Sequence, residues 1–225
     1  IAPLVDIGGK PMIQHVYERA VQSKADEVFI VTDAVDIQEA AAGFGASTVM
    51  TAADHPSGTS RLAEAASILE LPDDQIVVNV QGDEPFIRPE GLSSLIQVFK
   101  SDKNKDVDLA SLMIPITEEI NNPNVVKVIT DLSNRALYFS RSAIPHQRIQ
   151  ENHATVYKHV GVYAFRKNAL IDFYEHDITP LEESEKIEAI RYLEMGKTIQ
   201  MVETQFEGVG IDTAEDLERA KKLMD

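Results

Sequence analysis

The chain has 225 residues, 44% of them hydrophobic, which is enough for one domain with a buried core. Its 21 basic and 37 acidic side chains give a formal net charge of −16 at pH 7, and such a surface repels nucleic-acid phosphates and anionic lipids, so we expect neither as a partner. Cysteine is absent, which excludes disulfides and thiolate metal sites, and without an apolar run of about 20 residues or a signal peptide the expected location is the cytoplasm.

Short strands and helices alternate through the first half of the chain. Runs rich in Val and Ile predict strands at Val28–Thr32, Ser47–Met50, Ile76–Val80 and Leu109–Ile114. Helical periodicity predicts helices at Met12–Gln22, Ile37–Gly43, Arg61–Glu70 and Pro89–Lys100. This alternation predicts an α/β fold around a mostly parallel sheet.

The opening of the chain is unusual for such a fold. An α/β sheet of this type begins with a strand that leads through a loop into the first helix. Here the first helix is predicted to start near Pro11, after a short glycine-bearing lead with no apolar strand before it. We therefore expect the usual opening element to be missing from this chain.

Residues 121–166 follow an antiparallel pattern. Val125–Thr130 and Arg135–Ser140 flank the turn residues 131–134, which predicts a hairpin. Residues Tyr157–Phe165 alternate strictly, which places His159 and Tyr163 on one face, together with Tyr157 and Gly161. We expect an insertion within a single domain, 1–225, that serves as a subdomain or dimer surface.

Two helices are predicted in the last third. The first has Thr179 as its cap, Pro180 at its first position, Glu182 to complete a capping box and Gly196 at its end. The second begins near Ala214 and continues to the C-terminus.

Acidic residues follow two predicted strands. Asp83 comes after Ile76–Val80, at the carboxyl end where open parallel sheets bind ligands, and Gly82 allows a close turn before it. Asp212 lies at a second strand-to-helix junction, where Thr213 and Asp216 supply the capping pattern and leave Asp212 without a capping role. Carboxylates at such positions suit Mg²⁺, although either residue can also serve only in a turn.

Other polar residues are candidates for binding an anionic ligand. Ser57, Gly58, Thr59 and Arg61 open a helix, whose unpaired N–H groups attract anions, but serine and threonine are also common caps. Asp33 follows a strand and is more typical of a helix cap. Further candidates are Arg141 after a predicted strand, His159 with Tyr163 on one strand face, and Glu188 three residues before Arg191 on a helix. A lone histidine such as His159 is more often structural.

With these motifs, the sequence resembles the 3-deoxy-manno-octulosonate cytidylyltransferases, or CMP-Kdo synthetases. The resemblance covers nearly the whole chain, and the matching blocks occur in the family's order: GGKPMIQHVYERA, TDAVD, TAADHPSGTSRLAE, VVNVQGDEPFI, NPNVVKV, ALYFSRSAIP, YKHVGVYAF and GVGIDTAEDLERA. The set of blocks is far more specific than any one of them.

The resemblance implies a Rossmann-like nucleotide-diphospho-sugar transferase fold and a homodimer. It also implies Mg²⁺-dependent transfer of CMP from CTP to the anomeric hydroxyl of 3-deoxy-manno-octulosonate (Kdo), with release of pyrophosphate, for lipopolysaccharide biosynthesis. Asp83 and Asp212 match the family's metal ligands. The sugar-acid pocket is matched by Gln81, Arg141, His159, Tyr163 and Glu188, with Arg141 facing the substrate carboxylate. The nucleotide side is matched by Ser57, Gly58, Thr59 and Arg61.

The sequence departs from the family in two places. The family opens with ARxxSxRxPGKPL, whose Arg and Lys hold the triphosphate, whereas this chain opens with Ile1–Leu4, and Lys10 belongs to a later block. We therefore expect the N-terminal strand and phosphate loop to be missing. The chain also has Glu188-Ala189 where the family commonly has Glu-Gln. Three alternatives stay open: an 8-amino-Kdo enzyme, a sialic acid enzyme, and a nucleotide-binding dimer without catalysis.

Overall fold

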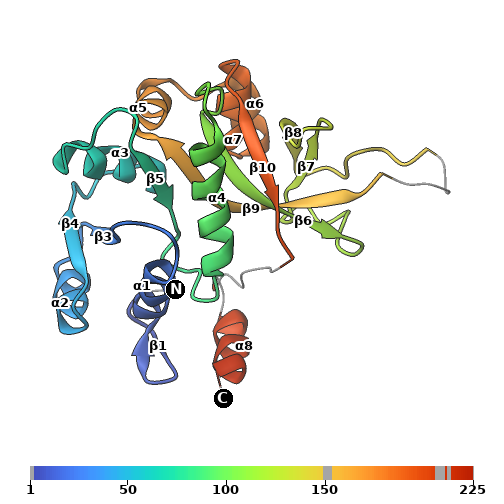
Figure 1. Ribbon diagram of the computed structural model, residues 1–225. Coiled ribbons are helices and arrows are strands. Elements are labelled where there is room, and N and C mark those ends of the chain that lie inside the picture. The colour runs from blue at the N-terminus through green and yellow to red at the C-terminus, as the bar shows by residue number, and fades with distance from the viewer. Residues whose placement is uncertain (1–2, 149–153, 206–210, 212–213, 225) are drawn as a thin grey trace.

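A central sheet with helices on both faces organises the computed structural model, which describes residues 3–148, 154–205, 211 and 214–224 (Figure 1). The strands run in the order β10-β6-β9-β7-β8, and β5 pairs with β9 beside β7. Their bounds are β5 (Ile76–Asn79), β6 (Leu109–Ile116), β7 (Lys127–Thr130), β8 (Ala136–Ser140), β9 (Val156–Arg166) and β10 (Ile199–Glu203). The predicted α/β class is confirmed.

The sheet contains more antiparallel pairing than the sequence predicts. β10 and β6 are parallel, but β9 runs antiparallel to β5, β6 and β7. The difference arises because β9, assigned to the insertion from its sequence, extends through the main sheet. Its last residues pair with β5 and its first residues with β7, as Val77↔Phe165 and Val128↔Tyr157 show. The hairpin of β7 and β8 is antiparallel as predicted.

The first strands stand apart from this sheet. β3 (Phe29–Thr32) and β4 (Ser47–Met50) form a separate parallel pair, and among the described residues no strand is hydrogen-bonded between β3 and β5. The glycine-bearing lead forms a small hairpin that the sequence analysis missed, with β1 (Asp6–Ile7) paired to β2 (Lys10–Pro11). Gly8 and Gly9 have φ values of 60° and 83°, which a two-residue turn of this kind requires and glycine adopts without strain.

Helices cover the two sheet faces with different core clusters. α4 (Pro89–Ser101) packs on one face, where Leu95 and Phe99 meet Leu112 of β6 and Val162 of β9. The other face is covered by α3 (Gly58–Ile68), α5 (Lys167–Glu175) and α7 (Ala189–Glu194), around Phe139 and other buried side chains. Each large apolar side chain buried in this way stabilises the fold by about 1.5–3 kcal/mol.

The helix predicted from Thr179 to Gly196 is interrupted, so that prediction is wrong. α6 (Pro180–Glu185) ends at Lys186, whose φ of 53° is left-handed, and α7 begins at Ala189. The start is as predicted, since the Thr179 N–H donates to the Glu182 carboxylate at 3.3 Å. The buried Glu182 also forms an ion pair with Arg191 at 2.6 Å. Arg191 therefore ties α7 back to the start of α6.

The C-terminal helix packs near the start of the chain. α8 (Ala214–Met224) contributes Leu217 and Ala220 to a small core with Ile7 and Met12, the latter the first residue of α1 (Met12–Val21). The remaining helix, α2 (Val35–Gly43), lies beside β3 and β4 (Figure 1). None of the helices in the described part of the chain is long and apolar enough to span a bilayer.

Candidate active site at the ends of β5 and α3

The first turn of α3 presents polar groups at the edge of the sheet. The hydroxyl of Ser57 accepts from the N–H of Ser60 at 3.2 Å and so caps the helix, which therefore begins three residues earlier than predicted. Thr59 is buried, and its hydroxyl donates to the Glu188 carboxylate at 2.8 Å. The sequence analysis assigned Thr59 to the nucleotide side and Glu188 to the sugar side, and the structure joins them.

The loop after β5 lies against this helix turn. A Cβ added at Gly58 would lie 3.6 Å from Oε1 of Gln81, an ordinary contact distance, so the Gln81 side chain packs directly beside the helix turn. Asp83 is half-buried, and its carbonyl accepts from the N–H of Ile211 at 2.9 Å. Asp212 lies outside the described residues, but its chain neighbour Ile211 is thus held beside Asp83.

The loop after β5 carries one described carboxylate, that of Asp83, which is a candidate for binding a magnesium ion. The described residues contain no cluster of three or more His, Asp or Glu side chains with metal-binding geometry. Mg²⁺ does not need one, because it commonly takes one or two carboxylates and completes its shell with phosphate oxygens and water. Asp83 supplies one such carboxylate, and its backbone carbonyl is bonded to the N–H of Ile211, the residue before Asp212.

His159 lies in the sheet interior on β9. The residue is 8% exposed, and burial lowers the pKa of its imidazole to about 4. The ring packs 4.8 Å from Phe139 and 5.5 Å from Tyr163, centroid to centroid. Nε2 lies 2.8 Å from the hydroxyl of Ser111 on β6.

The strict alternation predicted for this strand is interrupted. Ser111 pairs with Tyr163, but the next residue, Leu112, pairs with Val160, so β9 bulges at residues 161–162. Four residues of regular strand span about 13 Å, whereas the rings of His159 and Tyr163 are only 5.5 Å apart. The bulge therefore brings the two predicted pocket residues together.

A cavity joins β9, α3 and α7. Thr59, Tyr163, Glu188 and Ala189 line it, together with apolar side chains from the core. Burial and the nearby Glu188 charge raise the pKa of the Tyr163 phenol, which keeps its proton at neutral pH. Thr59, Tyr163 and Glu188 thus bring a hydroxyl, a phenol and a carboxylate to one small void, which has room for about one water molecule.

Arg141 follows β8 and is held by the α6–α7 connection. Its guanidinium donates to the carbonyls of Glu185 at 2.7 Å, Pro123 at 3.0 Å and Lys186 at 3.2 Å. Three of its five N–H donors are used in this way. The Glu185 carboxylate in turn accepts from the backbone N–H of Arg141 at 2.9 Å. The structure shows Arg141 as a fixed, half-buried cation near the start of α7.

A buried lysine supports the same region. Lys127 on β7 is fully buried, and its ammonium donates to the carbonyls of Asn122, Val125 and Arg141 at 2.9, 2.6 and 2.6 Å. Burial lowers the pKa of Lys127, while the charge of Glu185 acts in the opposite direction. All three of its donors are satisfied by these carbonyls.

Arg61 lies on the far side of the α3 turn. It forms an ion pair with Asp33 at 3.0 Å and donates to the hydroxyl of Thr51 at 2.8 Å, at the ends of β3 and β4. The structure thus assigns Asp33 to an ion pair with Arg61.

Sequence reasoning missed three residues that shape this site: Ser111, Lys127 and Glu185. Ser111 and Lys127 are polar residues within apolar strands, and that contrast is a signal which the sequence contains. Glu185 gives no such signal, since it is one of several acidic residues in a short helix.

Comparison with known proteins places these features in a family. A family model described as cytidylyltransferase matches residues 3–199. The 3-deoxy-manno-octulosonate cytidylyltransferase of Flavobacterium johnsoniae is 51% identical, over 97% of this chain and 90% of that protein. The enzyme of the same name from Christiangramia forsetii is 49% identical, over 97% and 88%.

Solved structures agree with this assignment. A CMP:2-keto-3-deoxy-manno-octonic acid synthetase complexed with CTP superposes with a TM-score of 0.93 at 41% identity, over 99% of this chain and 90% of that one. A 4-diphosphocytidyl-2C-methyl-D-erythritol synthase from Anaerococcus prevotii, 16% identical with a TM-score of 0.64 over 99% and 93% of the two chains, shares the fold. The chain belongs to the 3-deoxy-manno-octulosonate cytidylyltransferase family.

Proposed function

We propose that this protein transfers CMP from CTP to the anomeric hydroxyl of Kdo and releases pyrophosphate, in the cytoplasm, for lipopolysaccharide biosynthesis. Family membership supplies the reaction class. The observation that carries the proposal is the meeting of the β5 loop with the first turn of α3, where Gly58 faces Gln81 and Thr59 binds Glu188. A carboxylate-bearing loop thus lies beside the polar first turn of α3, an arrangement that suits a nucleotide bound next to a sugar acid.

Asp83 and Asp212 are the residues that would hold Mg²⁺ in this proposal. A bound Mg²⁺ neutralises triphosphate charge and lowers the pKa of the attacking hydroxyl. The first turn of α3 offers backbone N–H groups to the nucleotide, and the side chain of Gln81 lies beside that turn. Holding both reactants at one sheet edge converts a bimolecular encounter into an oriented attack.

Arg141, Tyr163 and Glu188 are the proposed contacts to the sugar acid. Arg141 has a fixed guanidinium with donors beyond those used by the three backbone carbonyls, and a carboxylate is its natural partner. Glu188 and Tyr163 line the cavity with Thr59. Carboxylate and phenol oxygens accept hydrogen bonds from sugar hydroxyls.

The residue after Glu188 supports a related sugar acid as a second candidate substrate. Ala189 lines the cavity directly beside Glu188, where the family commonly has glutamine. A small apolar residue in place of a carboxamide removes a hydrogen-bonding partner of the sugar. An 8-amino-Kdo, whose ammonium Glu188 would attract, is therefore the alternative substrate that the site favours.

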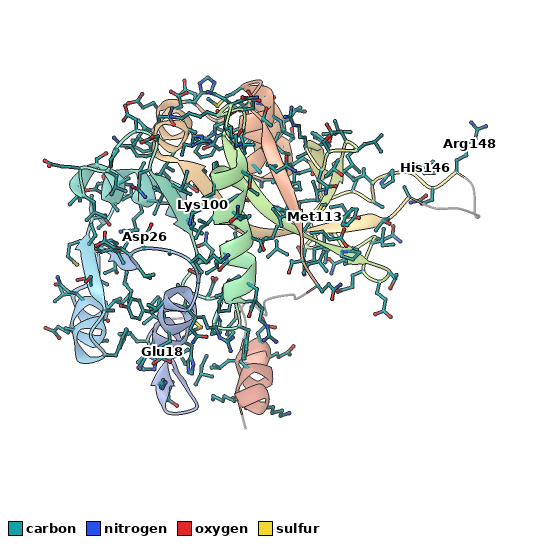
Figure 2. The ribbon with its side chains drawn as sticks, viewed as in Figure 1. Glu18, Asp26, Lys100, Met113, His146 and Arg148 are labelled. Carbon is teal, nitrogen blue, oxygen red and sulfur yellow. The ribbon has the colours of Figure 1, made fainter. Side chains whose placement is uncertain are left out.

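We also propose a homodimer formed through the insertion. In the β7–β8 hairpin Leu132 is fully exposed and Leu137 is 58% exposed. The segment after β8, with His146 and Arg148, extends away from the body (Figure 2). Exposed apolar residues on a projecting element are typical of an interface.

Light scattering tests the dimer and should give twice the 24.9 kDa chain mass. Leu137→Glu should reduce the measured mass, whereas the control Val35→Glu, at an exposed position on α2, should leave it unchanged. A wild-type monomer at micromolar concentration would contradict the dimer.

A pyrophosphate-release assay tests the reaction. It compares CTP, UTP and ATP, each with Kdo, 8-amino-Kdo or sialic acid, with and without Mg²⁺. The two relatives from Flavobacterium johnsoniae and Christiangramia forsetii should be assayed alongside as positive controls. We expect release only with CTP, Mg²⁺ and a Kdo-type acid. Equal turnover with UTP or ATP, or none with any octulosonate, would refute the proposal.

A further inference from the structure

Ser111 lies behind His159 in the sheet and contacts three polar atoms. Its side chain is 0% exposed. The hydroxyl oxygen lies 2.8 Å from the carbonyl oxygen of Val162, 3.2 Å from that of Val160, and 2.8 Å from Nε2 of His159. Both carbonyls belong to the β9 bulge, whose backbone turns them toward Ser111.

These contacts determine the direction of the hydrogen bonds. A serine hydroxyl has one proton, and a carbonyl oxygen can only accept. At 2.8 Å two oxygens repel each other unless a proton lies between them, so the Ser111 proton is donated to the bulge carbonyls. The Ser111 oxygen must then accept from His159, which requires the proton on Nε2.

The ring of His159 is neutral in this environment. Phe139 and Tyr163 pack against it, and burial is the cause that lowers its pKa to about 4. A neutral imidazole protonated at Nε2 has a lone pair on Nδ1. Such a nitrogen accepts hydrogen bonds from hydroxyl groups and donates none to a carboxylate.

We infer that Ser111 is a positioning residue that holds His159 in the Nε2–H tautomer and so keeps Nδ1 as a hydrogen-bond acceptor beside Tyr163, a residue of the proposed sugar-acid pocket. This inference rests on the proposed function for its substrate. In the proposed pocket, Arg141 would bind the carboxylate of the acid, and Nδ1 of His159 would accept a hydrogen bond from a hydroxyl of the polyol.

The tautomer is tested on the wild-type protein without substrate. Two-bond ¹H–¹⁵N correlation spectra of ¹⁵N-histidine-labelled protein distinguish protonated from unprotonated ring nitrogens, and His159→Gln assigns the signal among the six histidines. We expect a protonated Nε2 and an unprotonated Nδ1 at pH 7. A protonated Nδ1, or rapid exchange between the two tautomers, would overturn the inference whatever the enzyme's substrate is.

The functional consequence is tested with Ser111→Ala. We expect the KM for the sugar acid to rise about tenfold, with the KM for CTP unchanged, because one hydrogen bond to His159 is lost. Ser111→Thr, which restores the hydroxyl, should recover both the KM and the Nε2–H signal. Ser94→Ala is the control, since the hydroxyl of the exposed Ser94 donates to a helix carbonyl on α4.

The outcomes separate the two claims. An unchanged tautomer and KM in Ser111→Ala would refute the role of Ser111 while the proposed function stands. An enzyme that accepts no octulosonate would refute the substrate contact while the tautomer result still stands on its own. If Ser111→Ala fails to fold, the wild-type spectrum alone decides the tautomer.

Discussion

The burial of His159 makes the stability of the folded protein depend on pH. The unfolded histidine binds a proton near its ordinary pKa of about 6.5, whereas the folded one binds it only near pH 4. Between these values the unfolded chain holds more protons, so the free energy of unfolding falls as the pH falls. Below pH 4 both states are protonated and the effect is complete.

A variant isolates this contribution. We expect wild type to lose about 2–3 kcal/mol more stability than His159→Gln between pH 7 and pH 4.5, since each pKa unit is worth about 1.4 kcal/mol. Urea denaturation at the two pH values measures it. Carboxylates also titrate in this window, but they are common to both proteins. Parallel losses would mean that His159 is protonated in the folded state.

Asp83 is the described carboxylate assigned to the metal. Asp83→Asn should lower turnover at least about 100-fold, because in the proposed reaction it removes a charge that would hold Mg²⁺ against the triphosphate. The cooperative melt should be retained, since Asp83 is only half-buried. The exposed Asp26→Asn is the matched control (Figure 2). Near-normal turnover of Asp83→Asn would remove Asp83 from the metal site, and a lost melt would indicate a structural role.

At the scale of elements, Lys127 joins β7 to the segment that carries Arg141. Lys127→Met keeps the length of the side chain but leaves three carbonyls without their donor. Each unsatisfied buried polar group costs about 1–3 kcal/mol, so we expect a loss of several kcal/mol in chemical denaturation. The exposed Lys100→Met on α4 should be neutral. A small effect of Lys127→Met would mean that water replaces the ammonium.

Local sequence patterns predicted most helices and strands, and the errors occur where long-range contacts determine the structure. Ser47–Met50 has the predicted bounds, and α4 starts at Pro89 as predicted, since apolar periodicity and proline act locally. The break between α6 and α7 at Lys186 was missed because it depends on a distant contact. The carbonyls of Glu185 and Lys186 accept hydrogen bonds from Arg141, which lies 45 residues before Lys186. The β9 bulge depends likewise on its register with β6.

For the molecule as a whole, the motif blocks predicted the family, and the comparisons confirm it. The candidate site was predicted less completely. Sequence spacing identified Thr59 and Glu188 but not their hydrogen bond, because they lie 129 residues apart. The rule that ligands bind at strand ends placed Asp83 at the sheet edge. The contact between Asp83 and Ile211 could not be predicted, because it depends on how the last segment of the chain returns to β5.

The central claim is that CMP becomes joined to the anomeric oxygen of Kdo. The most direct measurement is NMR of the reaction mixture, with Kdo carrying ¹³C at the anomeric carbon. The account predicts a phosphodiester phosphorus coupled to the labelled carbon, formed in equal amount with pyrophosphate and only when CTP, Mg²⁺ and Kdo are together. Pyrophosphate accompanied by free CMP, or a phosphorus coupled to no labelled carbon, would contradict it.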